Sequence, residues 1–119
     1  MITELPQNIK EVLTKSNVEY EIEQTKNEKF INIKLSFKSS LVLIHDIVLT
    51  VPQINVEKIA SSMVERLYDI CNKFSNEEIT KRATELNINL DIPIEEAKDD
   101  LYRLKEYILD VRNQIAICI

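Results

Sequence analysis

The sequence predicts an α+β fold: a short N-terminal helix, a three-stranded antiparallel meander, and three helices, the last of them long and with a heptad seam. The spacing of apolar residues changes from a helical period to a two-residue period after residue 17, and it becomes helical again after residue 55. The chain has 119 residues, of which 45% are hydrophobic and 29% charged. This length and composition predict a single domain over residues 1–119, with helix and sheet in 5–51 and a helical part in 52–119.

The first helix is predicted from a short apolar stripe that contains Leu5, Ile9 and Leu13. Pro6 is tolerated at a helix start, because the first amides of a helix have no intrahelical partner. Asn17 is expected to end this helix, since asparagine accepts the left-handed backbone conformation found there.

A hairpin is predicted over residues 18–24 and 29–38, where apolar and polar residues alternate. Glutamates of the first strand then face lysines of the second, which stabilises the register. The alternation places Lys34 and Lys38 in solvent. The side chains expected in the core are Ile31, Ile33, Leu35 and Phe37.

A third strand is predicted over residues 41–51, after a turn at Ser39 and Ser40. This run is apolar at both parities, so we expect it to be covered on both faces. A bulge at His45 and Asp46 is an option, because two polar residues interrupt the run there.

The order helix, three strands, helix over residues 5–74 resembles that of a double-stranded-RNA-binding domain. Those domains bind through a lysine-rich start of their second helix. The corresponding stretch here, Pro52-Gln-Ile-Asn-Val-Glu-Lys58, has one lysine and one glutamate. The resemblance therefore concerns element order and does not imply RNA binding.

Three helices are predicted to follow the strands. Asn55 can cap the first, over residues 56–74, and Ser75 with Glu78 forms a capping box for the second, which we expect to end near Leu86. Residues 87–92 are then a connector before Pro93 opens the last helix.

The last helix has apolar residues at an unbroken 3-4-3-4 spacing, which is a heptad seam. Its members are Ile94, Ala97, Leu101, Leu104, Ile108, Val111, Ile115 and Cys118. We expect this seam to pack on residues 56–74 of the same chain; an intermolecular coiled coil is the alternative.

The last helix has further apolar residues off the seam, and together with the seam they are more than one facing helix can cover: Tyr102, Tyr107, Leu109, Ile117 and Ile119. We expect this helix also to cover the sheet or to meet another chain. Ile115, Ile117 and Ile119 also alternate, so this end could be a helix or a short strand. In either form, we expect these three isoleucines beneath the sheet or in a self-association interface, which leaves a homodimer open.

No catalytic, metal or cofactor site is predicted. The chain has no glycine, which excludes glycine-rich phosphate loops. His45 is its only histidine, and a structural role is expected for it, since no motif joins it to Cys71 or Cys118. The two cysteines suit reduced thiols in a cytoplasmic protein. No apolar run is long enough to span a membrane.

An acidic cluster surrounds the start of the last helix and is the one candidate partner-binding surface. It consists of Asp91, Glu95, Glu96, Asp99 and Asp100. Acidic residues are also favoured at helix N-termini for electrostatic reasons, so a merely solvated helix start is the simpler interpretation.

Function is left open between several classes. A net charge of −5 argues against general affinity for nucleic acid. We expect a small acidic protein-binding module without enzymatic activity, such as an inhibitor, immunity or antitoxin-type protein of a phage or mobile element. The alternatives are a dimeric chaperone-like or adaptor protein that holds a client segment, and, below that, a degenerate nucleic-acid-binding domain that uses Lys29, Lys34, Lys38 and Lys58.

Overall fold

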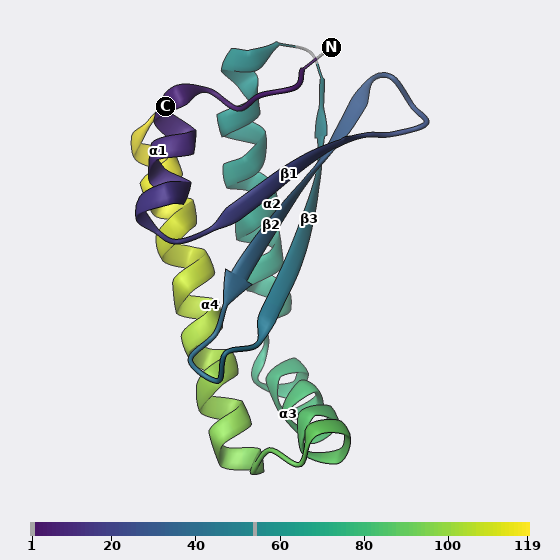
Figure 1. Cartoon of the computed structure of the whole chain (residues 1–119), viewed down its shortest axis with the longest axis vertical. Coiled ribbons are helices and arrows are strands. Elements are labelled where there is room, and N and C mark those ends of the chain that lie inside the picture. The colour runs from purple at the N-terminus through teal and green to yellow at the C-terminus, as the bar shows by residue number, and fades with distance from the viewer. Residues whose placement is uncertain (1, 54) are drawn as a thin grey trace.

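The predicted fold class is confirmed by the computed structural model, which describes residues 2–53 and 55–119. The element order is α1 (Gln7–Lys15), β1 (Glu19–Gln24), β2 (Phe30–Lys38), β3 (Ile44–Pro52), a 3-10 turn η1 (Val56–Lys58), α2 (Ile59–Lys73), α3 (Asn76–Leu90) and α4 (Ile94–Ile117). Helices α2 and α4 cover one face of the sheet, α1 closes the side next to β1, and α3 lies beyond the end of the sheet against α4 (Figure 1).

The hairpin formed by β1 and β2 agrees with the prediction. Its register pairs Ile22 with Ile33 and Glu21 with Lys34, whose charged groups lie 3.5 Å apart. The alternating apolar residues of β2 point into the core and are completely buried. Lys38 is exposed as expected, whereas Lys34 is half-buried.

The third strand differs from the prediction in three ways. It begins at Ile44, because a turn occupies residues 39–43 and Val42 adopts a left-handed φ of 63°. Its register with β2 runs without interruption through His45 and Asp46, so there is no bulge. The expectation that both faces are covered is also wrong, since Ile44 and Val48 are 70% and 52% exposed on the face away from the helices.

The predicted cap residues occupy the expected positions, but Asn55 caps the 3-10 turn η1, and α2 begins after that turn at Ile59, not at residue 56. Asn17 has the expected left-handed φ, of 56°, just after α1. The side chain of Asn55 accepts a hydrogen bond from the backbone N–H of Lys58, and that of Ser75 from the N–H of Glu78. The Glu78 half of the predicted capping box is not formed, because the Glu78 carboxylate instead accepts from Arg82 one turn further along the helix.

The end of α3 was predicted wrongly. The helix continues through the expected connector to Leu90, and Asp91 ends it with a left-handed φ of 54°. The chain reverses there because Pro93 restricts the residue before it and then opens α4. The Asn87 side chain donates to the Ile92 carbonyl and closes the connection.

The heptad seam of α4 is buried within this chain from Ala97 to Ile115, while its ends, Ile94 and Cys118, are partly exposed. It packs against α2 and α3, so the intramolecular prediction is the one that the structure confirms. Off the seam, Tyr107 meets Phe37 of β2 edge to face, with ring centroids 5.0 Å apart. The expectation that α4 also contacts the sheet is thereby confirmed.

The three C-terminal isoleucines differ in their exposure to solvent. Ile115 is buried in the core, but Ile117 and Ile119 are 79% and 68% exposed. Burial beneath the sheet is therefore wrong for these two residues, because Ile117 lies on the face of α4 away from the core and Ile119 lies beyond the end of the helix. Their place in a self-association interface stays a prediction. No helix in the described ranges is both long and apolar enough to cross a membrane.

Candidate functional site

The free edge of β3 is the candidate site, because β3 is an outer strand in the order β1-β2-β3. Ser39 N–H donates to the Leu43 carbonyl at 2.8 Å before this strand, and Gln53 N–H donates to the Lys29 carbonyl at 2.7 Å after it. In an antiparallel ladder, successive residues turn their N–H and C=O to alternate sides. With the uninterrupted register, odd-numbered residues of β3 bond to β2. The residues whose backbone groups point away from the sheet are therefore Ile44, Asp46, Val48 and Thr50.

One end of this edge is already occupied. Arg66 of α2 donates from Nε to the Thr50 carbonyl at 3.1 Å, which agrees with the deduced direction of that carbonyl. Within residues 2–53 and 55–119, no hydrogen bond is found to the outward N–H and C=O groups of Ile44, Asp46 and Val48. We call these three residues the open edge.

The open edge has fewer charged side chains than the other edge of the sheet. The other outer strand, β1, has Glu19, Glu21 and Glu23 exposed on the same face of the sheet, and charged side chains of this kind discourage strand addition. The open edge instead presents Ile44 and Val48, together with Asp46, whose carboxylate accepts from Ser36 at 2.8 Å. With Val42, which is 66% exposed, Ile44 and Val48 form an apolar strip on this face of the sheet.

A groove with a volume of about 440 Å³ runs beside the open edge, between β3 and the junction of α2 with α3. Its helical wall combines apolar and basic side chains: Ile70, Lys73, Phe74, Arg82 and Leu104. We call it the edge groove. The charged residues that line the edge groove are Lys73, Arg82 and Asp46, in a chain that is acidic overall.

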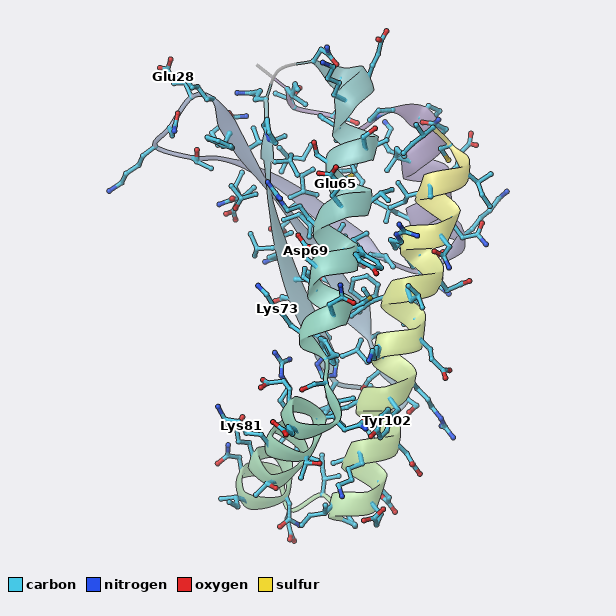
Figure 2. The ribbon with its side chains drawn as sticks, turned by 180° about the vertical axis from the view of Figure 1, so that it is seen from behind. Glu28, Glu65, Asp69, Lys73, Lys81 and Tyr102 are labelled. Carbon is cyan, nitrogen blue, oxygen red and sulfur yellow. The ribbon has the colours of Figure 1, made fainter. Side chains whose placement is uncertain are left out.

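The two basic side chains of the edge groove differ in whether they already have partners within the protein. The Arg82 guanidinium lies 4.8 Å from the centroid of the Phe74 ring, and its Nε is 3.1 Å from the Glu78 carboxylate. Lys73 is exposed near the end of α2 and makes no ion pair with any residue that the structure describes. Figure 2 places Lys73 on the side of α2 that faces β3, below Asp69 and Glu65. Lys73 is therefore available to a partner, whereas Arg82 supports the groove wall.

His45 points inward at the floor of this region, on the face opposite Asp46. Its Nε2 lies 3.9 Å from Oδ2 of Asp100, which is too long for a hydrogen bond, and among the described residues neither atom has a partner. Burial lowers the pKa of His45, and the charge of Arg82 adds to this, while Asp100 and Asp46 act in the opposite direction. Neutral imidazole is thus the favoured form in the folded protein.

Asp100 is a structural residue and not part of an acidic surface. Its side chain is 1% exposed, and Oδ1 accepts from the Ser40 hydroxyl at 2.6 Å and the Leu41 N–H at 3.2 Å. It therefore ties α4 to the turn that leads into the open edge. The candidate surface that included Asp100 is corrected accordingly: Asp91 ends α3, whereas Glu95, Glu96 and Asp99 are exposed near the start of α4.

The remaining candidate residues do not assemble a reactive site. Burial raises the pKa of the Cys71 thiol, which disfavours the reactive thiolate. The Cys118 sulfur lies by the backbone carbonyls of Asn8 and Gln114 at the far end of α4. In the ranges 2–53 and 55–119, no three His, Cys, Asp or Glu side chains gather as a metal site would require.

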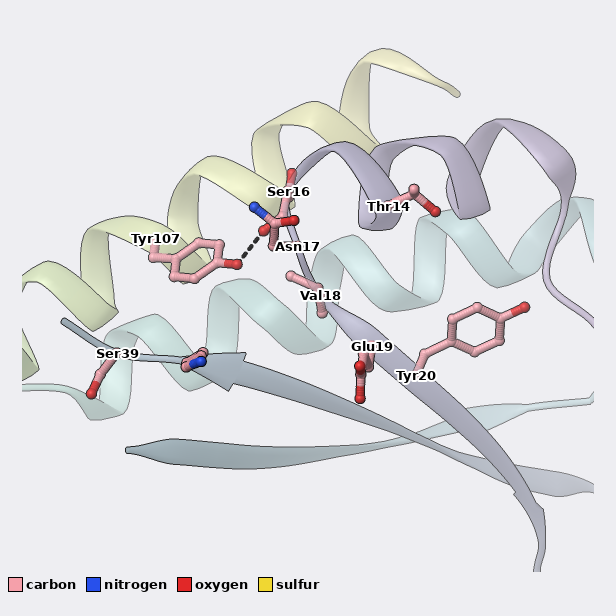
Figure 3. A pocket seen from close by; sticks show the side chains of 9 residues that line it. Thr14, Ser16, Asn17, Val18, Glu19, Tyr20, Ser39 and Tyr107 are labelled. Atoms are coloured by element: carbon pink, nitrogen blue, oxygen red, sulfur yellow. Dashed lines mark hydrogen bonds between the residues drawn. The ribbon is translucent and has the colours of Figure 1, made fainter. Parts of the chain in front are cut away.

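A hollow of about 1040 Å³ lies between the end of α1, the start of β1 and α4 (Figure 3). The Tyr107 hydroxyl donates there to the Ser16 carbonyl, which fastens the α1–β1 turn to α4. Burial raises the pKa of Tyr107, so this group stays protonated and continues to donate. The hollow is wide and lined by polar and apolar groups alike, and the Tyr107–Ser16 hydrogen bond within it joins α4 to the α1–β1 turn.

Sequence reasoning missed Ile44, Val48 and Lys73 as site residues. The last strand of a three-stranded meander is always an edge strand, and the absence of charged residues at Ile44 and Val48 is the signal that identifies it as open. Comparison of this chain with protein-family models, with curated proteins and with solved structures gives no match.

Proposed function

We propose that this chain is a protein-binding module whose partner docks on the apolar strip of β3. The observation that supports this is the exposure of Val42, Ile44 and Val48, at 66%, 70% and 52%, on an edge strand whose open edge has one charged side chain, Asp46. Apolar side chains gathered in this way are typical of interaction sites, and covering them is worth roughly 25 cal/mol per Å² of apolar surface.

The position of the apolar strip favours a chaperone-like or adaptor protein over an inhibitor. An inhibitor that uses its acidic helices would be expected to present the start of α4, where Asp100 is unavailable because it is buried. A chaperone-like or adaptor protein that holds a client segment would be expected to present an open strand and a groove, as β3 does. The adaptor form is therefore the one we favour. The proposal includes no catalytic step.

The proposal is tested by comparing partner capture by three proteins in extracts of the native cell, with chemical crosslinking and mass spectrometry. The strip variant is Ile44→Lys with Val48→Lys. The matched control is Ile88→Lys with Leu90→Lys, at positions of α3 that are 73% and 54% exposed. Both variants add the same charge, and surface changes of this kind alter stability by about 0.5 kcal/mol or less each.

The expected result is a partner that wild type and control recover equally and that the strip variant recovers at least about tenfold less, a loss of ~1.4 kcal/mol in binding free energy. Thermal melting by circular dichroism verifies that all three proteins are folded. Equal recovery by the strip variant and the control would show that the apolar strip is not the docking surface.

A further inference from the structure

Building on the proposed function, we infer that the partner supplies an extended segment that pairs with the open edge as a fourth strand, and that a carboxylate of this segment enters the edge groove at Lys73. The inference has two independent supports, one from the backbone of β3 and one from the charges of the groove.

The backbone support is the set of unpaired groups on the open edge. Ile44, Asp46 and Val48 each direct one N–H and one C=O away from β2, in the alternation that an added strand needs. Arg66 blocks the edge at Thr50. The available length is therefore the stretch from Ile44 to Val48, which suits a short extended segment and not a whole sheet.

The pleat of the sheet determines where the side chains of such a segment would go. Residues opposite each other in neighbouring strands point to the same face. Segment residues opposite Ile44 and Val48 would thus cover the apolar strip, and we expect apolar residues there. Segment residues opposite His45 and Ile47 would point inward, into the edge groove.

The charge support concerns these inward residues. The edge groove has Lys73 and Arg82 in its wall, and Glu78 already pairs with Arg82. Lys73 has no acidic partner among the described residues and faces β3 (Figure 2). A glutamate or aspartate at an inward position would supply that partner, whereas a lysine there would be repelled.

The test uses two synthetic peptides that read alike in both chain directions, so that parallel and antiparallel addition are probed together. The first is acetyl-Thr-Val-Glu-Thr-Glu-Val-Thr-amide, and the second has lysine at both glutamate positions. Amide hydrogen exchange of wild type is followed by NMR at several peptide concentrations. In the free protein, the outward amides of Ile44, Asp46 and Val48 are expected to exchange faster than those of His45 and Ile47, which bond to β2.

With the glutamate peptide at about ten times its dissociation constant, exchange at Ile44, Asp46 and Val48 is expected to slow about tenfold, because only the free fraction exchanges. The lysine peptide is expected to bind about fivefold more weakly, a ratio that corresponds to ~1 kcal/mol for a surface ion pair. Lys73→Glu is expected to abolish this preference. The matched control is Lys58→Glu, an exposed lysine at the other end of α2 with the same change in net charge, and it is expected to keep the preference.

Three outcomes would overturn the inference. No slowing at these amides with either peptide at ~10 mM would exclude strand addition, while the capture experiment judges the proposed function separately. Equal affinity of the two peptides, or an unchanged preference in Lys73→Glu, would exclude the carboxylate. Without peptide, the edge amides could instead become more protected from exchange as the protein concentration rises, with a dimer seen in sedimentation. That result would identify a second copy of this chain as the occupant.

Discussion

Replacing Asp100 with alanine tests whether the carboxylate holds the β2–β3 turn. The change removes the acceptor of two hydrogen bonds, at 2.6 Å from the Ser40 hydroxyl and 3.2 Å from the Leu41 N–H. Hydrogen bonds to charged groups contribute roughly 1.5–3 kcal/mol each, so the gross loss is about 3–6 kcal/mol. Removing a buried carboxylate also removes its desolvation cost, which offsets part of this loss. We expect a net decrease of about 2–4 kcal/mol in the free energy of unfolding.

The assay is urea unfolding followed by circular dichroism, with Asp99→Ala as the matched control. Asp99 is the exposed neighbour of Asp100 on the same helix, and its replacement is expected to change stability by about 0.5 kcal/mol or less. Ser40→Ala alone and together with Asp100→Ala completes a double-mutant cycle, in which the two losses should not add. The reasoning is refuted if Asp100→Ala is as stable as Asp99→Ala.

Three further predictions concern the core, the C-terminus and His45. Ile33→Ala is expected to lower the free energy of unfolding by about 2–5 kcal/mol, because Ile33 is fully buried in β2; a loss below 1 kcal/mol in urea unfolding would mean that the site collapses around the smaller side chain. Ile115→Ala is expected to cost a similar amount, whereas Ile117→Ala, two residues further on, should change stability by about 0.5 kcal/mol or less; an equal, concentration-dependent loss in melting temperature would place Ile117 in a self-association interface. The NMR-measured pKa of His45 is expected below 6.5, and Asp100→Asn should lower it further by removing a charge that raises it; a value above 6.5 would show that Asp100 outweighs burial.

The shift at His45 also sets the sign of a stability change with pH. A lowered folded-state pKa means that the unfolded chain binds the proton more readily, so the contribution of neutral His45 is complete above the unfolded-state value of about 6.5. It is lost as the pH falls through the lower, folded-state pKa. The variant His45→Gln should therefore lose less stability than wild type on acidification from pH 7 to pH 5, as measured by urea unfolding. Parallel pH profiles would assign the loss to other groups.

The sequence was sufficient for elements whose determinants are local. Strand β2 alternates strictly between core and solvent, so its parity could be assigned without knowing what covers it. The start of α3 was predicted from Ser75, whose side chain needs only an amide three residues away. The end of α3 was not predicted correctly, because residues 87–90 contain asparagine and isoleucine, which form helices only moderately well. In addition, the helix is ended by Asp91 in a left-handed conformation, where a glycine would be the usual signal.

Features that depend on distant residues were beyond sequence reasoning. The apolar run of β3 indicates burial on both faces only if something covers the second face, and no described element does. Asp100 was grouped with its acidic neighbours, although its spacing from Ala97 and Leu104 places it on the buried face of α4. Its acceptor role depends on Ser40, 60 residues away, and that proximity is a property of the tertiary structure.

The two edges of one sheet give the strongest argument for the proposed site. Both are outer strands of one three-stranded sheet, and both face the same risk of pairing with other chains. β1 exposes Glu19, Glu21 and Glu23 on this face, whereas the β3 residues at the same levels of the sheet are Asp46, Val48 and Thr50. Ile44 follows one step further along β3, and the groove beside it contains a lysine that is unpaired among the described residues. Charged residues in place of Ile44 and Val48 would improve solubility at little cost to stability, because both side chains already lie largely in water. Exposed apolar residues lower solubility, and the sheet has them on the β3 edge but not on the β1 edge. A partner strand that covers Ile44 and Val48 would explain this difference between the two edges.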